Sequence, residues 1–263
     1  MVLEVIYVVR HAFRTNWAVD PETGVYTASI LSPTNIPSDA PLTSYGVEQS
    51  KQLADHLARL QPPIDRIYSS PFYRCLQTLE PYIKENGMEI RGETGIGEWY
   101  GAALFDHPSP ASTSALRQLF PTYSESYIPA IIPSPSGESI EQLYDRTAYA
   151  LAHMIAQLDA EEGQPKAILL CTHAATLVAA GRILTGHLPE HAEEEDFKPF
   201  TCSLSKFTRR RESSDNIEFT GTVGPDEERP KFDWRKGRGI GGGWDCVMNG
   251  DCSFLKGGAQ RGW

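Results

Sequence analysis

The chain has 263 residues, of which 40% are hydrophobic and 22% charged, a composition typical of a globular protein with a full hydrophobic core. Its net charge of −10 excludes general attraction to nucleic acids or anionic membranes, so an anionic ligand needs a local basic pocket. We expect neither a membrane span nor a signal peptide, because no long apolar run is present. The five cysteines form no CxxC pair, which favours a reducing compartment, the cytoplasm, the nucleus or both.

The first predicted element is a strand over residues 5–9, five apolar residues typical of a strand buried on both faces. Arg10, His11 and Arg14 follow it directly, and such groups are expensive to bury without partners. At the carboxyl end of a buried strand, they are expected to face the crevice in which α/β proteins bind ligands. Two arginines beside one imidazole suit a phosphate dianion, which the imidazole could attack. Surface ion pairs are the alternative for this cluster taken alone.

Residues 16–41 are rich in Pro, Ser, Thr and Asp and show little periodicity, so a surface loop is predicted there. A helix follows, with Thr43 as its N-cap and apolar residues at helical spacing to about Leu60. Residues 65–69 form the next short strand. After it, Arg74 lies in the first turn of a helix, where free backbone N–H groups favour anions. This arrangement predicts a phosphate site; a solvent-facing arginine is the alternative.

A glycine-flanked loop at residues 95–101 holds Glu98 between aromatic neighbours. These surroundings are expected to raise the pKa of the Glu98 carboxyl group and to keep its proton available near neutral pH. Glu93 is the rival candidate, and a surface glutamate in a turn is the alternative. Residues 102–135 are rich in Pro and Ser and contain a short helix around 114–120, which indicates a mobile insertion or lid over the pocket.

The longest amphipathic helix is predicted over residues 136–161, followed by a wholly apolar strand at 167–171. That strand ends in His173, so a second imidazole stands at a strand end beside a helix N-terminus. Residues 209–263 are predicted to form a loop-rich C-terminal extension with little core. Within it, Asn249 and Gly250 predict the turn of a β-hairpin between residues 244–247 and 252–255.

Four segments resemble signatures of the histidine phosphatase superfamily, which includes phosphoglycerate mutases and acid phosphatases. They are Arg-His-x-x-Arg at 10–14, Ser-Pro-x-x-Arg at 70–74, Gly-Glu-Trp at 97–99 and Thr-His-Ala at 172–174. Arg14 is more similar to the acid-phosphatase and protein-tyrosine-phosphatase branches than to the mutases, and Ala12 replaces the usual glycine. Further matches along nearly the whole chain resemble a fungal group that contains the phosphatase-domain subunit of transcription factor TFIIIC and stand-alone homologues.

This resemblance implies a phosphoglycerate mutase-like α/β fold: three layers, α/β/α, around a mainly parallel sheet. It implies one domain over residues 1–263 with a C-terminal β-hairpin extension. It also implies that His11 forms a phosphohistidine, that Glu98 is the general acid, and that neither a metal nor another cofactor is required. The groups expected to hold the phosphate are Arg10, Arg14, Arg74 and His173.

Aromatic residues beside the motifs predict an apolar rim that suits aryl phosphates or phosphotyrosine better than sugar phosphates. The predicted rim consists of Phe13, Asn16, Trp17, Tyr73, Trp99 and Tyr100. One alternative is a phosphoglycerate mutase or sugar phosphatase, for which residues 102–135 offer only His107 and Arg117 as extra basic groups. Another is a weakly active interaction module related to a TFIIIC subunit, with protein partners in a transcription complex. We expect no direct binding to nucleic acid or membranes.

Overall fold

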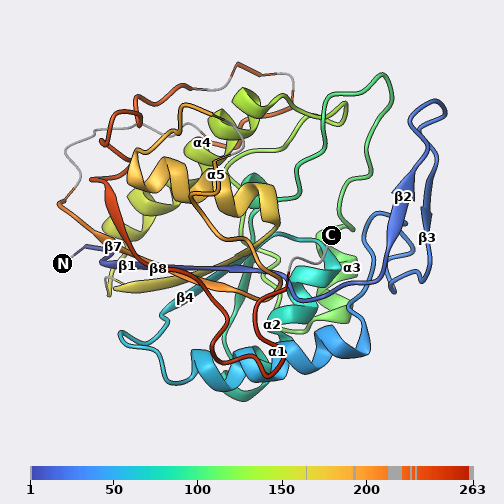
Figure 1. The fold of residues 1–263 in the computed structure, drawn as a ribbon, viewed down its shortest axis with the longest axis horizontal. Helices are drawn as coiled ribbons and strands as arrows, with labels where there is room; N and C mark the ends of the chain where they lie inside the picture. The colour runs from blue at the N-terminus through green and yellow to red at the C-terminus, as the bar shows by residue number, and fades with distance from the viewer. Residues whose placement is uncertain are drawn as a thin grey trace.

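A computed structural model describes residues 2–163, 165–191, 194–212, 221–225, 227–228 and 230–260. Its core is a six-stranded sheet in the order β5-β4-β6-β1-β7-β8, covered by helices on both faces (Figure 1). The strands of this sheet are β1 Val5–Arg10, β4 Arg66–Ser69, β5 Ile90–Gly92, β6 Ala167–Thr172, β7 Leu204–Arg209 and β8 Trp244–Asp251. The predicted three-layer α/β fold with a mainly parallel sheet is confirmed.

The four strands β5, β4, β6 and β1 run parallel, whereas β7 pairs antiparallel with β1 and β8 antiparallel with β7. Every residue of β1 and β6 is buried, as expected for apolar strands with helices on both faces. The register pairs Arg10 of β1 with Thr172 of β6, and Ser69 of β4 with Cys171 of β6. The carboxyl ends of three neighbouring strands therefore lie at one edge of the sheet.

Helices α1 and α2 cover one face of the sheet, and α4 and α5 cover the other (Figure 1). The helices are α1 Ser44–Leu57, α2 Tyr73–Asn86, α3 Thr113–Leu119, α4 Ile140–Ala160 and α5 Ala174–Thr185, and a 3-10 helix, η1, spans Thr94–Ile96. The Thr43 side chain caps α1 by accepting from the Gly46 N–H, as predicted. The two faces of the sheet carry separate hydrophobic clusters of buried side chains. No helix among the described residues combines the length and apolarity needed to cross a membrane.

The segment predicted as a loop over residues 16–41 contains a two-stranded hairpin, so that prediction was incomplete. Strands β2 (Trp17–Val19) and β3 (Tyr26–Ala28) pair antiparallel and project from one end of the molecule (Figure 1). Each strand has only three residues, too few for a clear alternation of polar and apolar side chains.

The C-terminal segment corrects two predictions. Asn249 and Gly250 do not form a hairpin turn, because both lie inside the continuous strand β8. The C-terminal pair is β7 with β8, and their register shifts near Met248, where Gly250 takes a left-handed φ of 66°. The Asn-Gly pair thus serves a β-bulge. The prediction of little core was also wrong, because Trp234 and Trp244 are buried in the hydrophobic cluster under α4 and α5.

Candidate active site

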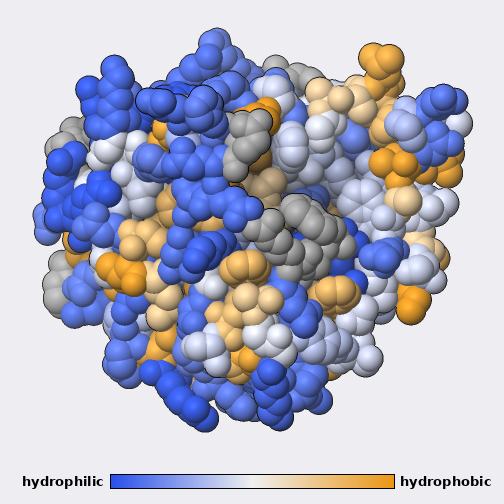
Figure 2. Space-filling view, viewed as in Figure 1, coloured by the Kyte–Doolittle hydropathy of each residue, from blue (hydrophilic) through white to orange (hydrophobic). Residues whose placement is uncertain are grey.

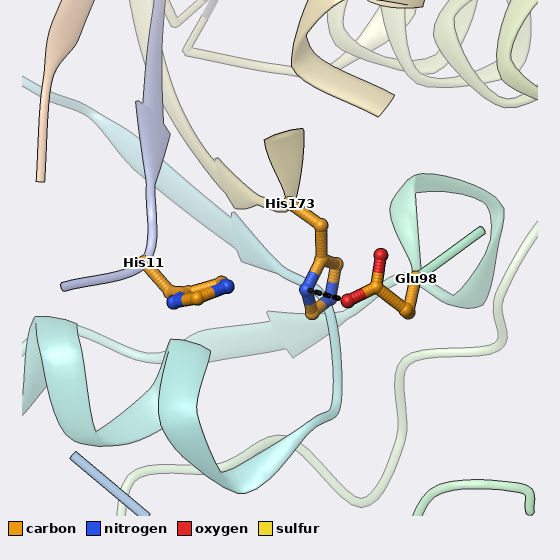
Figure 3. A group of neighbouring side chains, drawn as sticks. All are labelled: His11, Glu98 and His173. Carbon is orange, nitrogen blue, oxygen red and sulfur yellow. Dashed lines mark ion pairs between the residues drawn. The ribbon is translucent and has the colours of Figure 1, made fainter. Parts of the chain in front are cut away.

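The edge of the sheet brings two imidazoles together. Arg10 and Thr172 are paired neighbours, so the residues that follow them, His11 and His173, leave adjacent strands at the same level. Their ring centroids lie 5.3 Å apart with the rings edge to face, and both side chains are buried. Figure 3 shows the two rings and the carboxylate of Glu98 close together. The predicted grouping of these three side chains is therefore what the fold produces.

The His11 ring is neutral and oriented by the backbone. Its Nδ1 lies 2.8 Å from the carbonyl oxygen of Ala12, to which a neutral ring donates the Nδ1 proton, leaving Nε2 with a free lone pair. Burial lowers the pKa of His11 well below its usual value, and the positive charges of Arg74 and Arg10 lower it further. A buried, unprotonated imidazole with one nitrogen held by a carbonyl is suited to nucleophilic attack.

The loop around His11 is held by α1 and α2. The Ala12 N–H donates to the Thr78 hydroxyl at 2.9 Å, and Ala12 is absent from the described non-glycine residues with positive φ. The methyl group of Ala12 is therefore tolerated at a position where the signature that this segment resembles usually has glycine. Gly46 of α1 passes so close that a Cβ there would lie 2.0 Å from the Phe13 carbonyl oxygen. Glycine at 46 thus lets α1 support the loop directly.

The His173 ring lies between a carboxylate and a hydroxyl group. Its Nδ1 is 3.2 Å from Oε2 of Glu98, and its Nε2 is 2.7 Å from Oγ of Ser70. Burial alone lowers the pKa of His173, but Cys75 and Glu98 beside it raise the pKa above its usual value. A protonated His173 donates from both nitrogens, one proton to Glu98 and one to Ser70.

The pKa of Glu98 corrects a prediction. Aromatic surroundings were expected to raise it, and burial does act in that direction. His173 and Arg74 overcome this effect and hold the pKa of Glu98 well below its usual range. Arg74 donates from Nη2 to Glu98 Oε2 at 2.8 Å. The sequence could not reveal this, because the two cationic partners, His173 after β6 and Arg74 in the first turn of α2, are distant from Glu98 along the chain.

Arg74 is fully buried in the first turn of α2, as its motif predicted. It donates to the Ser38 carbonyl at 3.0 Å, and its Nη1 lies 3.6 Å from the Asp39 carboxylate. Burial lowers the pKa of Arg74, but Glu98 and Asp39 raise it overall, so the guanidinium stays charged. Asp39 also accepts from the Tyr73 N–H at 2.7 Å, which ties the loop after β3 to the start of α2.

Arg10 and Arg14 complete a group of three guanidinium ions. Arg10 is buried and donates to the Pro199 carbonyl at 2.7 Å, whereas Arg14 lies over the Trp17 ring at 5.4 Å. Burial, together with repulsion from neighbouring guanidinium ions, lowers the pKa of each to about 10. All three guanidinium groups remain cationic at neutral pH, and the effect of their charges on one another indicates that they lie close together.

The ligand atoms of His11, Glu98 and His173 lie within 4.8 Å of one another, a spacing that could also hold a metal ion. The surrounding charge opposes a cation, however, because Arg10, Arg14 and Arg74 interact electrostatically with this cluster. The three guanidinium ions and the protonated His173 together carry more positive charge than the Glu98 carboxylate neutralises. This site attracts a doubly charged anion more strongly than a divalent metal.

Both carboxylate oxygens of Glu93, the rival acid, accept hydrogen bonds. It accepts from the Tyr127 hydroxyl at 2.7 Å, from the Ala130 N–H at 2.9 Å and from the Gly95 N–H at 2.7 Å. These bonds tie the insert, residues 102–135, to the loop that carries Glu98. Glu93 therefore has a structural role, and Glu98 is the carboxylate that reaches the imidazoles.

A buried ion pair supports the Glu98 loop from below. Arg146 of α4 donates to Glu138 at 2.8 Å, and its Nη1 donates to the carbonyl oxygens of Gly95 at 3.1 Å and Gly97 at 3.3 Å. Both charged side chains are almost fully buried. Removing one partner of such a pair would leave a buried charge without compensation. This support was missed in the sequence, since Arg146 looks like an ordinary helix residue.

Of the predicted rim residues, only some lie together in one aromatic cluster beside the site. Tyr100 lies at the centre of an aromatic cluster with Trp17 and Phe72, at ring-centroid distances of 6.1 and 6.3 Å. Two residues of this cluster were missed as rim members, Tyr26 of β3 and His107, which stacks on Tyr100 at 4.8 Å. No sequence pattern indicated that Tyr26 and His107 meet at Tyr100, because they are far apart in the chain and Tyr26 belongs to the unpredicted hairpin.

The other predicted rim residues have partners elsewhere. Phe13 packs against Tyr45 of α1, and Tyr73 against Phe120. Trp99 donates from its ring to the Glu138 carbonyl at 2.9 Å. Asn16 is exposed, and its carbonyl accepts from Ser29.

Glu98 opens onto a cavity of about 280 Å³ between the insert and the start of α2. Its walls include Phe72, Tyr100 and His107, together with several prolines of the insert, and its lining contains no Lys or Arg. A second cavity, of about 390 Å³, borders Arg10 and Trp99 on the other side. Glu98 thus borders the smaller cavity, and Arg10 borders the larger one.

Comparisons with known proteins point in one direction. Residues 6–219 match the model of the histidine phosphatase superfamily (branch 1). Over its full length, this chain is 33% identical to the transcription factor tau 55 kDa subunit of Saccharomyces cerevisiae and covers 59% of that protein. It is 30% identical over 171 residues to ecdysteroid-phosphate phosphatase of Drosophila melanogaster, covering 62% of this chain and 22% of that protein. The chain thus spans less than two thirds of these relatives.

Solved structures share the fold at low identity. The ecdysone phosphate phosphatase of Bombyx mori, crystallised with tungstate, aligns at a TM-score of 0.55 and 19% identity, covering 88% of this chain and 98% of that one. Phosphoglycerate mutase from Bacillus anthracis aligns at a TM-score of 0.53 and 13% identity, covering 95% and 94%. The expected phosphoglycerate mutase-like architecture is therefore confirmed.

Proposed function

Because this chain belongs to the histidine phosphatase superfamily (branch 1), we propose that it hydrolyses phosphate monoesters through a phosphohistidine on His11. One observation carries the proposal: a neutral His11 ring lies 5.3 Å from a second imidazole whose pKa is raised, among three guanidinium ions. A nucleophile and a preorganised anion site are what phosphoryl transfer demands of a protein.

In the first step, Nε2 of His11 forms the N–P bond while the bond from phosphorus to the leaving oxygen breaks. Arg10, Arg14, Arg74 and His173 stabilise the charge on the other phosphate oxygens. The phosphate's negative charge competes with Glu98 for Arg74 and His173, which raises the pKa of the Glu98 carboxyl group. Glu98 thereby takes up the proton that it delivers to the leaving oxygen.

In the second step, water attacks phosphorus and the N–P bond breaks. Glu98, again a carboxylate, accepts the proton of that water, and inorganic phosphate leaves with His11 restored to its neutral form. No step requires a metal, because the cationic side chains neutralise the transferred group.

We infer that aryl phosphates, phosphotyrosine among them, are the preferred substrates. Phe72 and Tyr100 line the cavity onto which Glu98 opens, and Trp17 packs against Tyr100. Aromatic rings of a substrate stack favourably on such side chains. A phosphoglycerate mutase or sugar phosphatase is less favoured. A second anionic group would need a cation, and the cavity beside Glu98 has no Lys or Arg in its lining.

A second candidate function rests on a different observation, the 33% identity over the whole chain with a transcription factor subunit. In this reading the protein is a weakly active interaction module with partners in a transcription complex in the nucleus. Stable capture of such partners by a His11→Ala variant would favour it, because binding would then not depend on turnover.

The decisive experiment measures p-nitrophenyl phosphate hydrolysis and phosphoenzyme formation without added metal. The wild type is expected to release p-nitrophenol and, after acid-free quenching, to yield a phosphorylated peptide containing His11. His11→Ala should lose both, since nothing replaces the covalent route. His187→Ala is the matched control, because His187 is exposed and lies outside the site. Turnover that survives in His11→Ala would contradict the covalent role.

A further inference from the structure

Two segments far apart in the sequence meet beside the site. Gly24, at the end of the β2–β3 turn, packs so closely on the insert that a Cβ there would lie 2.6 Å from the Phe105 ring. Two residues further along each segment, the hydroxyl of Tyr26 and Nδ1 of His107 form a hydrogen bond. The hairpin and the insert therefore form one continuous wall next to the cavity that Glu98 faces.

The outward side of this wall is apolar and acidic. Val25 is 57% exposed and Leu104 fully exposed, and Asp20, Glu22 and Asp106 are exposed around them. These five residues are called the mouth surface below. Figure 2 shows hydrophobic side chains among strongly hydrophilic ones at the end of the molecule that carries the hairpin. Exposed apolar side chains gathered beside a functional site indicate contact with a partner.

The charged side chains of the hairpin and the insert are almost all acidic. Residues 15–41 contain no Lys or Arg, and residues 92–145 contain only Arg117. The lining of the cavity beside Glu98 has none either. Apart from Arg117, whose side chain donates to the Tyr123 carbonyl oxygen, the hairpin and the insert therefore bring no lysine or arginine to this side of the phosphate site. Arg182 and Lys198 border the larger cavity instead. A ligand that extends beyond its phosphate meets an electrostatic preference for positive charge.

We propose that the cavity and the mouth surface bind the polypeptide around a phosphorylated tyrosine and select basic and apolar residues beside it. This inference rests on the proposed phosphatase function and names its substrate as a protein. A chain of aromatic contacts leads from His173 through Phe72 and Tyr100 to Tyr26, each ring pair within 6.3 Å. Residues next to a phosphotyrosine reach such a surface, because an extended chain covers about 3.3 Å per residue. The acidic residues also disfavour an anionic lipid surface.

The test compares two phosphotyrosine peptides that differ only in flanking residues, Arg and Leu in one and Glu and Ser in the other. The wild type is expected to have a kcat/KM about tenfold higher for the basic peptide, since each exposed ion pair changes binding by about two- to fivefold. The double variant Glu22→Lys, Asp106→Lys should remove or reverse this preference. It leaves Asp20, which caps its own turn, in place. Hydrolysis of p-nitrophenyl phosphate should change less than twofold.

The matched control is Asp55→Lys, Glu85→Lys, which changes net charge equally on exposed parts of α1 and α2. It should keep the wild-type preference. Leu104→Ser should lower kcat/KM for both peptides and not for p-nitrophenyl phosphate. Equal kcat/KM for the two wild-type peptides, or Leu104-dependent binding to phosphatidylcholine vesicles, would overturn the inference. If p-nitrophenyl phosphate is not hydrolysed at all, the proposed function itself fails, which is a distinguishable result.

Discussion

His11 and His173 follow the last paired residues of two adjacent parallel strands, and their environments differ most in the charge of the groups that face each ring. Both rings are almost fully buried, and the same guanidinium, Arg74, lies near both. Nδ1 of His11 faces the neutral carbonyl of Ala12, however, whereas Nδ1 of His173 faces the carboxylate of Glu98. The pKa of the first is lowered and that of the second raised.

This contrast teaches that burial does not decide the charge of an active-site imidazole. Burial lowers the pKa of both rings, since a charged ring loses its hydration. The sign of the net shift depends on whether an anion or a neutral dipole faces the ring. One fold position, the end of a buried parallel strand, thus holds a neutral imidazole after β1 and a protonated one after β6. The proposed mechanism uses the first as nucleophile and the second as a fixed cation for one phosphate.

The largest expected effect on the contrast between the two rings comes from replacing Glu98, the anion beside Nδ1 of His173. Glu98→Gln should lower kcat for phenyl phosphate by about 10²–10⁴, the usual contribution of general acid–base catalysis. p-Nitrophenyl phosphate should lose much less, because its leaving group departs without protonation. The same variant should lower the pKa of His173, measured by NMR titration of its ring protons. Equal losses with both substrates would argue against proton donation by Glu98.

The sequence predicted the strand ends but not the charges on them. Arg10, His11 and His173 each follow an apolar run, and Arg74 lies in the first turn of the helix after a short strand. Their place at one edge of a parallel sheet could therefore be inferred from the sequence. The ionised state of Glu98 could not, because it depends on contacts with Arg74 of α2 and with His173 after β6. Contacts between distant segments leave no trace in a single sequence.

The same reason explains what else was missed. Asp39 supports Arg74 from a loop that has no periodic pattern, and Tyr26 belongs to three-residue strands too short to show alternation. Asn249 and Gly250 are a strong turn signal, but pairing of β8 with β7 along its whole length outweighed it and turned the pair into a bulge. Local propensity fails where tertiary pairing supplies more hydrogen bonds.

The pH dependence should separate the two rings. In the proposed mechanism His11 acts as a neutral nucleophile and its pKa is lowered, so activity should persist as pH falls through 6.5, the ordinary histidine value. His173 acts as the cation and its pKa is raised, so kcat should fall only when pH rises above 6.5 and His173 loses its proton. The alkaline loss should level off near the rate of His173→Gln, about 10²-fold below the maximum. Loss of activity between pH 7 and 6 would contradict a neutral His11.

The smallest expected effect comes from Ser70, which contacts the other ring nitrogen of His173, Nε2. Ser70 Oγ accepts from Nε2 at 2.7 Å, a contact that His11 does not have, and it favours the protonated ring. Ser70→Ala should therefore lower the pKa of His173 and reduce kcat about two- to tenfold, the range of one hydrogen bond. Ser69→Ala is the matched control, because Ser69 is equally buried and its hydroxyl donates to a backbone carbonyl instead. If both variants shift the pKa of His173 equally, the effect comes from packing, and Ser70 does not hold the proton.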